Sequence, residues 1–450
     1  MVTGVLQLCE LDQARLDGKL GKAMQFAMQT IVTAAHIDRA DALIDISFAH
    51  IDACFYNGRA HLDFVNYMLE HGATLAVPSW TNNGLVSLND LSVRDPLASR
   101  EMHEARELMQ AYVKLGCNPV WTCAPYQLPG RPGLGDHIVG SESNAVSFYN
   151  SVIGARSNMY GDYLDVCAAI TGRVPLSKLH RDEARAAQIL FDVGNIPQAV
   201  RNNDLFYHLL GYVVGRKCGN LVPAIVGLPE SCEEDDLKAI SAAGSSAGSV
   251  PLFHAIGITP EAATLEIAFQ GRQPLQVIEL TIDDLRQARD ELGQNSDQPL
   301  AGVALGTPHF SYTEFERLVN LLDGRSIDPR LTFYLTTSRH VFEQANQQGW
   351  IESLQRAGIK IITDTCTYFS PAVNGLHGKI MTNSAKWAYY APGILGVDVV
   401  FGGLGGDCAE PMDVVKPQDV KGTLRQAVGV SFGVGFSNFD VEYAGCRVGR

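Results

Sequence analysis

Three cysteines stand where apolar runs of the sequence break into polar turn residues: Cys123, Cys366 and Cys408. A cysteine at the carboxyl end of a strand is presented into the crevice where open α/β sheets bind their ligands. Three thiolates can hold iron and leave one coordination position free for a substrate. The alternative is that all three are buried structural residues, because free cysteines commonly pack as small hydrophobic side chains and no Cys-x-x-Cys pair accompanies them.

A second group of residues with chemical potential lies between Gly135 and His180, where short polar side chains are dense and long charged ones are few. Such side chains suit a close-packed pocket for a small polar substrate, and an arginine there can clamp a carboxylate through two hydrogen bonds. Helix caps and turns also favour Ser, Asn and Gly, so a structural role stays open for each residue. The residues singled out are His137, Glu142, Ser143, Asn144 and Arg156.

Two further polar clusters are separated widely from the first in sequence. Lys386 lies among small residues and aromatics, which suggests a cation directed into a partly dry site, although surface lysines are far commoner. Ser79 and Asn82 lie in a polar turn that we predict directly after a strand. Clusters spaced in this way are typical of the strand-end loops that converge on one α/β active site.

The elements that must position these residues follow an alternating pattern. Leu16, Leu20, Met24, Ala27 and Ile31 recur every three or four residues, which predicts a helix, and further helices are predicted over 63–70, 99–115 and 237–243. Ser311 and Glu314 form a capping box that predicts a helix start. The predicted strands are 42–46, 74–77, 120–122, 221–226, 250–256, 275–280, 303–305, 331–335 and 359–362. Such alternation predicts an α/β protein in two or more lobes, with parallel and mixed sheets covered by helices.

Composition limits the classes of function. The chain has 450 residues with 46% hydrophobic and 19% charged residues, as in an ordinary soluble globular protein of two or three domains. Its net charge of −14 argues against binding nucleic acid or anionic lipid. The N-terminus does not read as a signal peptide, and no apolar run approaches the roughly 18 residues that span a bilayer. Ten dispersed cysteines fit a reducing compartment, so we expect a cytoplasmic protein.

Familiar catalytic motifs are absent or stand in the wrong context. The sequence has no phosphate-binding Gly-x-x-x-x-Gly-Lys-Ser/Thr loop and no His-Glu-x-x-His zinc helix. A Gly-x-Ser-x-Gly match occurs at 244–248, which is the motif of a serine hydrolase's nucleophile elbow. An elbow requires a strand before it and a helix after it, whereas a helical pattern precedes this match and a predicted strand follows it. A serine hydrolase is therefore the weaker alternative.

Several longer motifs surround the residues named above. They are Thr-Cys-Ala-Pro-Tyr at 122–126, Gly-Asp-His at 135–137, Glu-Ser-Asn-Ala-Val at 142–146, Asn-Ser-Val-Ile-Gly-Ala-Arg at 150–156, Ala-Ala-Ile-Thr-Gly-Arg at 168–173, Phe-His-Ala-Ile-Gly-Ile-Thr-Pro-Glu at 253–261, Asp-Thr-Cys at 364–366 and Thr-Asn-Ser-Ala-Lys at 382–386. In this order, from about Leu8 to Cys408, the chain resembles the large catalytic part of the aconitase X family. The resemblance implies an aconitase-like fold over 1–408, with possible lobes at about 1–228 and 229–408, followed by an extension over 409–450.

The resemblance also implies a reaction. Members of this family resemble cis-3-hydroxy-L-proline dehydratases in bacteria and phosphomevalonate dehydratases in archaea, lyases that remove water from a small hydroxy acid. They carry iron or an iron-sulfur cluster on three cysteines, and Cys123, Cys366 and Cys408 fall at the matching motifs. Iron in such a site binds the leaving hydroxyl as a Lewis acid while a fixed base takes the proton.

The remaining polar residues then receive expected roles. Arg156 or Lys386 would bind the substrate carboxylate. His137, Glu142 and Lys386 are the candidates for transferring protons or for supporting the iron ligands. The residues expected to orient the substrate are Ser79, Asn82, Ser143 and Asn144. Because these pocket residues are mainly small and neutral, they favour hydroxyproline over phosphomevalonate, which needs several cations around its phosphate.

In this family a smaller swivelling domain, fused or supplied as a separate subunit, closes over the site and brings a serine. We find no match to that domain in this chain, and residues 409–450 are too few to form it. The resemblance therefore predicts a small swivel-domain partner. The alternatives that stay open are a phosphomevalonate dehydratase, a serine hydrolase and a metal-free, non-catalytic relative.

Overall fold

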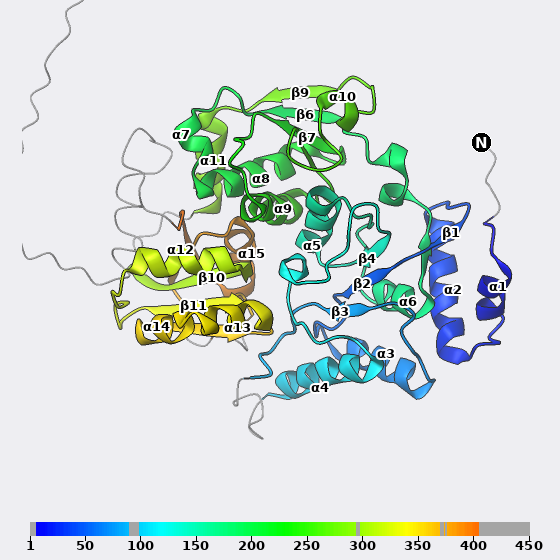
Figure 1. The fold of residues 1–450 in the computed structure, drawn as a ribbon. Helices are drawn as coiled ribbons and strands as arrows, with labels where there is room; N and C mark the ends of the chain where they lie inside the picture. Colours follow the sequence, from blue (N-terminus) through cyan, green and yellow to red (C-terminus); the bar gives the residue numbers. More distant parts are fainter. Residues whose placement is uncertain (1–5, 90–98, 294–297, 370–372, 374–375, 405–450) are drawn as a thin grey trace, which may run out of the picture.

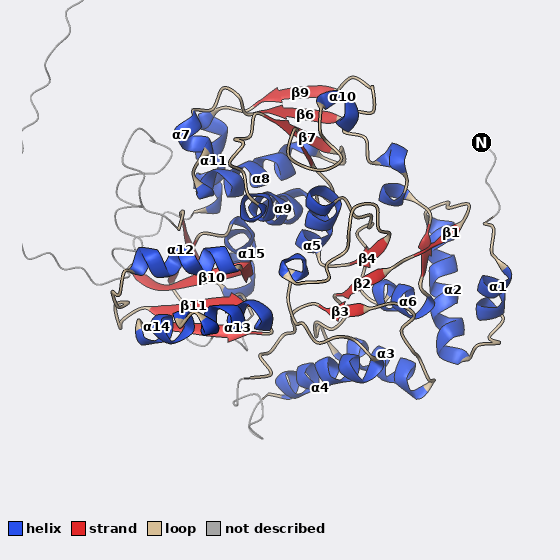
Figure 2. Ribbon diagram, in the orientation of Figure 1, coloured by secondary structure: helices blue, strands red, loops and turns tan. Residues whose placement is uncertain are grey.

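The computed structural model of the chain describes residues 6–89, 99–293, 298–369, 373 and 376–404. Helices and strands alternate in three groups that follow one another along the chain (Figure 1). Parallel sheets covered by helices occur in every group, which confirms the predicted α/β class (Figure 2). Cys408 and the predicted extension at 409–450 lie outside the described residues.

The first group contains a three-stranded parallel sheet with the order β3-β2-β4. Its strands are Ser79–Thr81 (β3), Phe48–Ile51 (β2) and Ile138–Gly140 (β4). Asn82 directly follows β3, Asp52 directly follows β2, and Glu142 comes two residues after β4. Because the strands run parallel, these three side chains leave the sheet at the same edge.

The first group also contains six α-helices among the described residues and an antiparallel strand pair. The helices are Glu10–Leu16 (α1), Lys22–Ile37 (α2), Arg59–Glu70 (α3), Arg100–Leu115 (α4), Ser143–Phe148 (α5) and Leu164–Thr171 (α6), and the pair is Leu43–Asp45 (β1) with Arg173–Pro175 (β5). The single helix predicted from Leu16 to Ile31 is wrong: α1 ends before Gly18 and α2 begins after Gly21. These glycines have φ of +77° and +100°, which a right-handed helix does not accept.

Two strands predicted in this group do not form. Residues 74–77 are irregular, and pairing with β2 starts only after Pro78, which has no backbone N–H to donate. Residues 120–122 are irregular because Trp121 adopts a φ of +46°, outside the extended region.

The second group forms a parallel sheet with the order β8-β7-β6-β9. Its strands are Ile189–Asp192 (β6), Pro223–Val226 (β7), His254–Ala255 (β8) and Gln276–Glu279 (β9), and its helices are Gln198–Arg201 (α7), Asp204–Cys218 (α8), Glu234–Gly248 (α9), Leu265–Ala268 (α10) and Ile282–Leu292 (α11). The strand predicted over 250–256 is reduced to its last part. The predicted lobe boundary between 228 and 229 falls inside this sheet, because β6 and β7 precede it while β8 and β9 follow it.

The third group is a five-stranded parallel sheet with the order β12-β11-β10-β13-β14. Its strands are Leu300–Phe310 (β10), Thr332–Thr337 (β11), Ile359–Thr363 (β12), Lys379–Thr382 (β13) and Asp398–Phe401 (β14), and its helices are Tyr312–Leu322 (α12), Arg339–Gln347 (α13), Trp350–Arg356 (α14) and Ala385–Leu395 (α15). The predicted capping box is confirmed: the Ser311 hydroxyl accepts from the Glu314 N–H, and the Glu314 carboxylate accepts from the Ser311 N–H.

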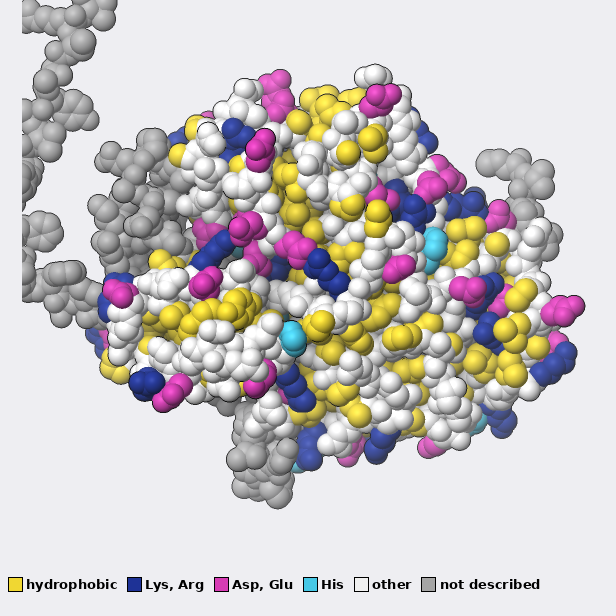
Figure 3. All heavy atoms as spheres, in the orientation of Figure 1, with side chains coloured by type: hydrophobic (Ala, Val, Ile, Leu, Met, Phe, Trp, Pro, Cys, Tyr) yellow, Lys and Arg dark blue, Asp and Glu magenta, His cyan; other side chains and the backbone are white. Residues whose placement is uncertain are grey.

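Ion pairs and shared packing join the second and third groups. Lys238 on α9 pairs with Glu314 on α12, and Arg317 on α12 pairs with Glu233. Acidic and basic side chains are interspersed over this part of the surface (Figure 3). On α15, the buried Trp387 packs into the same hydrophobic cluster as α8 and α9. None of the helices in the described ranges has the length and apolar character needed to cross a membrane.

Candidate active site

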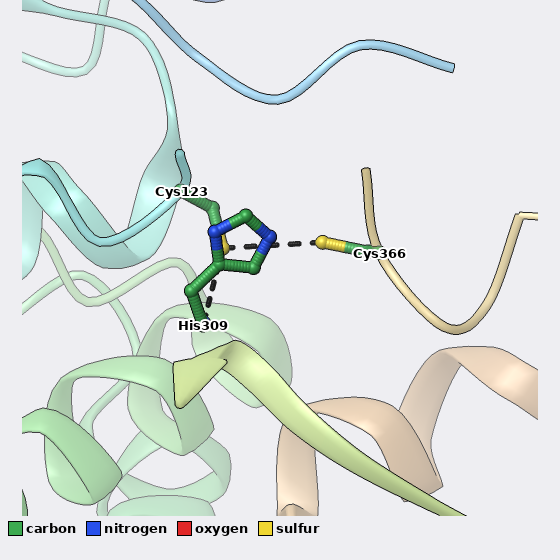
Figure 4. A group of neighbouring side chains, drawn as sticks. All are labelled: Cys123, His309 and Cys366. Carbon is green, nitrogen blue, oxygen red and sulfur yellow. Dashed lines mark hydrogen bonds between the residues drawn. The ribbon is translucent and has the colours of Figure 1, made fainter. Parts of the chain in front are cut away.

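Cys123 and Cys366 lie next to each other although they are 243 positions apart in sequence, with their Sγ atoms separated by 3.9 Å. Cys366 comes three residues after β12, and Cys123 comes from the irregular segment beyond Trp121 (Figure 4). Their exposed fractions are 2% for Cys123 and 0% for Cys366. Two thiolates at about 2.3 Å from one tetrahedral metal stand about 3.8 Å apart, so the pair fits two ligands of a single metal.

The pKa of Cys366 indicates the protonation state of this side chain in the metal-free protein. Its hydrogen bond with Cys123, together with burial, raises the pKa of Cys366 well above its usual value. Cys366 is therefore a thiol when no metal is bound, and a metal would displace its proton on binding. The third predicted ligand, Cys408, cannot be placed beside the pair because it lies outside the described residues.

A histidine that the sequence did not single out completes this cluster. His309, near the carboxyl end of β10, has a ring nitrogen within 4.8 Å of both sulfurs, and its side chain is fully buried. Burial lowers the pKa of His309 to about 4, so the ring is neutral at physiological pH. The available signal was its place at the end of the apolar run that forms β10, the same signal that pointed to the cysteines.

Glu142, Asn144 and Lys386 are brought together in a second buried cluster. Glu142 caps the start of α5: its Oε2 accepts from the Ala145 N–H at 2.8 Å and from the Asn144 amide, and its Oε1 accepts from the Lys386 ammonium. The other end of the Asn144 amide accepts from the Tyr126 hydroxyl at 2.9 Å. Hydrogen bonds therefore join Tyr126, Asn144, Glu142 and Lys386 into one buried network.

Lys386 is held as a cation in this cluster. It lies in the first turn of α15, which Ser384 caps, and its side chain is 4% exposed. Burial lowers the pKa of Lys386, but the Glu142 carboxylate and the sulfurs of Cys123 and Cys366 outweigh burial and raise it. The ammonium and the cysteine pair are therefore within electrostatic reach of each other.

Asn82 lies at the same sheet edge and contacts a carboxyl group that the sequence analysis missed. Its side-chain amide donates to Asp52, while its own Oδ1 is buried without a hydrogen-bond partner in the described part of the chain. Burial, with the charges of Asp162 and Glu142, raises the pKa of Asp52 to about 8. An aspartate directly after the apolar run 48–51 was the signal that could have identified it.

Three other predicted site residues lie elsewhere. His137 precedes β4 whereas Glu142 follows it, so the three residues of β4, at about 3.3 Å each, stand between them. Arg156 pairs with His137 in a β-bridge and its guanidinium binds Asp182, at the amino end of β4. Ser79 begins β3, and its hydroxyl donates to the Val77 carbonyl at 2.9 Å. Ser143 is half-buried as the first residue of α5, next to Glu142.

His137 belongs to a separate cluster with His180 and Tyr160. The Nδ1 atoms of the two histidines are 3.0 Å apart, and the Tyr160 hydroxyl lies 2.6 Å from Nε2 of His180. Burial, with the charges of His137, Arg185 and Arg156, lowers the pKa of His180 to about 3. This ring is therefore neutral in the folded protein.

Buried neutral histidines predict a loss of stability in mild acid. The pKa is lowered to about 3 at His180 and, by burial, to about 4 at His50, whereas an unfolded histidine titrates near about 6.5. The unfolded chain therefore binds more protons below about pH 6.5, and each ring lowers the free energy of unfolding by about 1.4 kcal/mol per pH unit as pH falls. Urea unfolding between pH 7 and 5 measures this slope. His180→Gln should remove one ring's share, and an unchanged slope would contradict the assignment.

The Gly-x-Ser-x-Gly match is a helix-packing feature. Residues 244–248 form the end of α9, where a Cβ atom on Gly248 would lie 1.9 Å from the Gly215 carbonyl oxygen of α8. The glycines therefore allow two helices to approach closely. The hydroxyls of Ser245 and Ser246 both donate to the Ala242 carbonyl, so neither is presented as a nucleophile.

A covalent serine probe tests this interpretation. We expect a fluorophosphonate to leave the folded protein unlabelled, because both serine side chains are buried in a helix and no base contacts them among the described hydrogen bonds. Intact-mass spectrometry after incubation is the measurement, with a serine protease as the positive control. Labelling of Ser245 or Ser246 would revive the hydrolase.

Fold and site together define a multi-domain α/β protein with a buried thiol pair beside a buried lysine–glutamate pair. Family models match nearly the whole described chain: Aconitase X first domain over 5–183, Aconitase X second domain over 187–290 and Aconitase X third domain over 300–411. The chain belongs to the aconitase X family, which confirms the resemblance found in its motifs.

Similar proteins include two dehydratases of one name and the large subunit of a third. Cis-3-hydroxy-L-proline dehydratase of Pseudomonas aeruginosa is 42% identical, over 90% of this chain and 69% of that protein. The protein of the same name from Hypocrea jecorina is 37% identical, over 94% and 72%. The phosphomevalonate dehydratase large subunit of Thermococcus kodakarensis is 34% identical, over 86% and 95%.

A solved structure agrees with the fold. The holo-form of Thermococcus kodakaraensis aconitase X superimposes with a TM-score of 0.77 at 31% identity, over 88% of this chain and 97% of that chain. The likeness therefore extends through all three groups of elements and not to one sheet alone.

Proposed function

We propose that this chain is the catalytic part of a hydro-lyase that dehydrates cis-3-hydroxy-L-proline. The two similar dehydratases of that name support this substrate, at 42% and 37% identity. The reaction would break the C2–H and C3–O bonds, form a C2=C3 double bond and release water, after which the enamine tautomerises to a pyrroline-2-carboxylate. The observation that carries the proposal is the pair of buried cysteines 3.9 Å apart, within electrostatic reach of a buried cation.

Iron, alone or in an iron-sulfur cluster, is the cofactor that these residues fit. Cys123 and Cys366 would hold it, with Cys408 as the proposed third ligand. When bound, it supplies Lewis-acid assistance to a hydroxyl that must leave from carbon, which is otherwise a poor leaving group. The donor set supports this choice, because thiolate ligands in tetrahedral arrangement are typical of iron-sulfur and zinc sites.

Lys386 is the proposed partner of the substrate carboxylate. An ammonium has three donors, and Glu142 takes one of them, which leaves two for a carboxylate. Because its pKa is raised, Lys386 stays protonated and serves as a cation and not as a base. Glu142 and Asn144 would fix the position of the ammonium, so that both reacting bonds of the substrate stand in a defined place.

Asn82 is the other predicted substrate contact that the sheet edge supports. Its buried Oδ1 lacks a partner among the described groups, and the ring N–H of a hydroxyproline is a donor of suitable kind. Ser143, next to Glu142, stays a proposed contact as well. The positions of His137, Arg156 and Ser79 give no support to roles in this site.

The charge balance favours hydroxyproline over phosphomevalonate. Among the described residues of the two clusters, Lys386 is the cation, and the Glu142 carboxylate already neutralises it. A phosphate would require further cationic groups. We therefore keep phosphomevalonate as the second candidate substrate, supported by the similar large subunits.

A further domain is proposed to complete the site. The chain spans 69% of the length of the Pseudomonas aeruginosa dehydratase and 95% of the Thermococcus kodakarensis large subunit. Both figures suit a catalytic part that works with a smaller piece, either fused or separate. A cytoplasmic location is likewise proposed, supported by free cysteines throughout the described residues.

A substrate panel tests the proposal. The protein, purified without oxygen in its native assembly, should convert cis-3-hydroxy-L-proline and leave trans-4-hydroxy-L-proline unchanged, because the latter carries no hydroxyl on the carbon next to C2. Product is measured by NMR. Conversion of phosphomevalonate in its place would transfer the function to the second candidate, and conversion of neither would contradict the proposal.

A further inference from the structure

We infer that His309 is a positioning residue that holds the loops of Cys123 and Cys366 at the separation a metal requires, and that it is not itself a metal ligand. The inference rests on the proposed function only in taking the two cysteines as a metal site. His309 comes from β10, and thus from neither cysteine's own segment (Figure 4).

Both ring nitrogens of His309 bind the residue that directly precedes a cysteine. Nε2 lies 2.9 Å from the Thr365 carbonyl oxygen, one residue before Cys366. Nδ1 lies 2.9 Å from the Thr122 hydroxyl, one residue before Cys123. The imidazole therefore bridges the two loops through Thr122 and Thr365. The separation of these two residues sets the separation of the cysteine sulfurs that follow them.

A third hydrogen bond fixes Cys123 itself. The backbone N–H of His309 points to the Cys123 sulfur, with a nitrogen–sulfur distance of 3.4 Å. The Thr122 hydroxyl in turn accepts from the Ala124 N–H at 3.0 Å, which fixes the hydroxyl on the other side of Cys123. One residue thus ties down Cys123 from two directions and Cys366 from one.

The directions of these bonds leave no lone pair for a metal. A carbonyl oxygen only accepts, so Nε2 must carry the ring proton and donate to Thr365. In the neutral ring, Nδ1 is then the acceptor, and the Thr122 hydroxyl donates to it. A ligating histidine needs one free nitrogen lone pair, so metal binding would break the bridge to one of the two loops.

The bridge also explains how the loops of Cys123 and Cys366 are preorganised for metal binding. Without it, two loops 243 positions apart would have to be ordered when the metal binds, at a cost in conformational entropy. Residues that orient metal ligands without touching the metal typically change affinity by about 10–100-fold. We expect that size of effect from the loss of His309.

The test uses Co²⁺ binding to metal-free protein, because visible absorption of Co²⁺ reports thiolate ligands and geometry. His309→Phe keeps a ring but removes both side-chain hydrogen bonds, and His309→Gln can keep the bond to Thr365. The matched control is His254→Phe, since His254 lies in the sheet of the second group, is also buried and places Nε2 2.7 Å from the Arg185 carbonyl oxygen. Cys366→Ala identifies the absorption that belongs to the site.

We expect His309→Phe to bind Co²⁺ about 10–100-fold more weakly, His309→Gln to fall between it and the unaltered protein, and His254→Phe to bind normally. At saturating Co²⁺ the three histidine variants should give the same spectrum as the unaltered protein. An unchanged affinity in both His309 variants would overturn the positioning role, and a changed saturated spectrum would make His309 a ligand. His309→Gln serves alone if the phenylalanine variant does not fold.

The outcomes separate this inference from the proposed function. The protein could bind Co²⁺ in a way that depends on Cys366 and His309, yet hold no iron and dehydrate no substrate. That result would refute the proposed function and leave the inference standing. The His309 variants could instead dehydrate the substrate and bind Co²⁺ with normal affinity. That result would refute the inference and leave the proposed function standing. Absence of Co²⁺ absorption that depends on Cys366 would overturn the inference.

Discussion

Cys366→Ala is expected to remove bound iron and to lower turnover of the hydroxy acid by about 10³-fold or more. The side chain contributes one of two sulfurs 3.9 Å apart, and alanine leaves Cys123 as a single thiol in that pair. Lewis-acid assistance is worth several kcal/mol of barrier, and each 1.36 kcal/mol is tenfold in rate. Iron per chain and initial rate, measured together without oxygen, check the prediction.

Cys167→Ala is the matched control for this change. Cys167 is also fully buried, in α6, but its neighbours belong to the hydrophobic cluster of the first group of elements. Its loss should cost some stability and leave both iron content and rate per folded molecule unchanged. Iron retained at full level in Cys366→Ala would show that the pair is structural.

Lys386→Met is expected to reduce both stability and activity strongly. Removal of the ammonium leaves the Glu142 carboxylate buried without its cation, a kind of change that costs about 3–5 kcal/mol. The substrate carboxylate would lose its proposed partner at the same time. Urea unfolding gives the stability change, and the kinetic constants per folded molecule give the functional one.

A double variant separates the two effects. Glu142→Gln with Lys386→Met removes both charges, so we expect most of the stability to return while activity stays lost. Lys238→Met is the matched control, because Lys238 is equally buried but pairs with Asp235 and Glu314 in place of Glu142. It should lose stability and keep its activity per folded molecule. Normal substrate affinity in Lys386→Met would contradict the carboxylate-binding role.

Much of the fold follows from patterns that local physics enforces. The α/β class and the third sheet were predictable, because buried parallel strands give apolar runs such as 303–305 and 359–362. The failures lie where a single backbone angle decides. Trp121 has a positive φ, which interrupts an apolar run that otherwise predicts a strand. The residue type does not indicate this backbone angle.

The site was predictable where an element's end carries the chemistry. Cys123 and Cys366 both follow apolar runs, and the structure brings them together. His309 and Asp52 stand in the same kind of place, but their roles depend on contacts with residues far along the chain, which spacing does not reveal. Thr122 and Thr365 could not be recognised as partners of one histidine before the fold was known.

Proximity in sequence does not correspond to proximity in the site at one strand, β4. His137, Glu142 and Arg156 belong to one polar stretch, yet β4 separates the first from the second, and Arg156 joins His137 at its amino end. Only side chains beyond the carboxyl end of a parallel strand reach the shared crevice. A run of three residues is too short to be recognised as a strand from the sequence.

The most direct measurement of the central claim follows cis-3-hydroxy-L-proline in D₂O by NMR, with the iron-loaded protein in its native assembly. The account predicts that the C2 and C3 proton signals of the substrate disappear as it is consumed. The product should be a pyrroline-2-carboxylate that carries solvent deuterium at C3. Cys366→Ala should show no reaction. Unreacted substrate in the presence of protein shown to hold iron, or equal conversion by Cys366→Ala, would contradict the account.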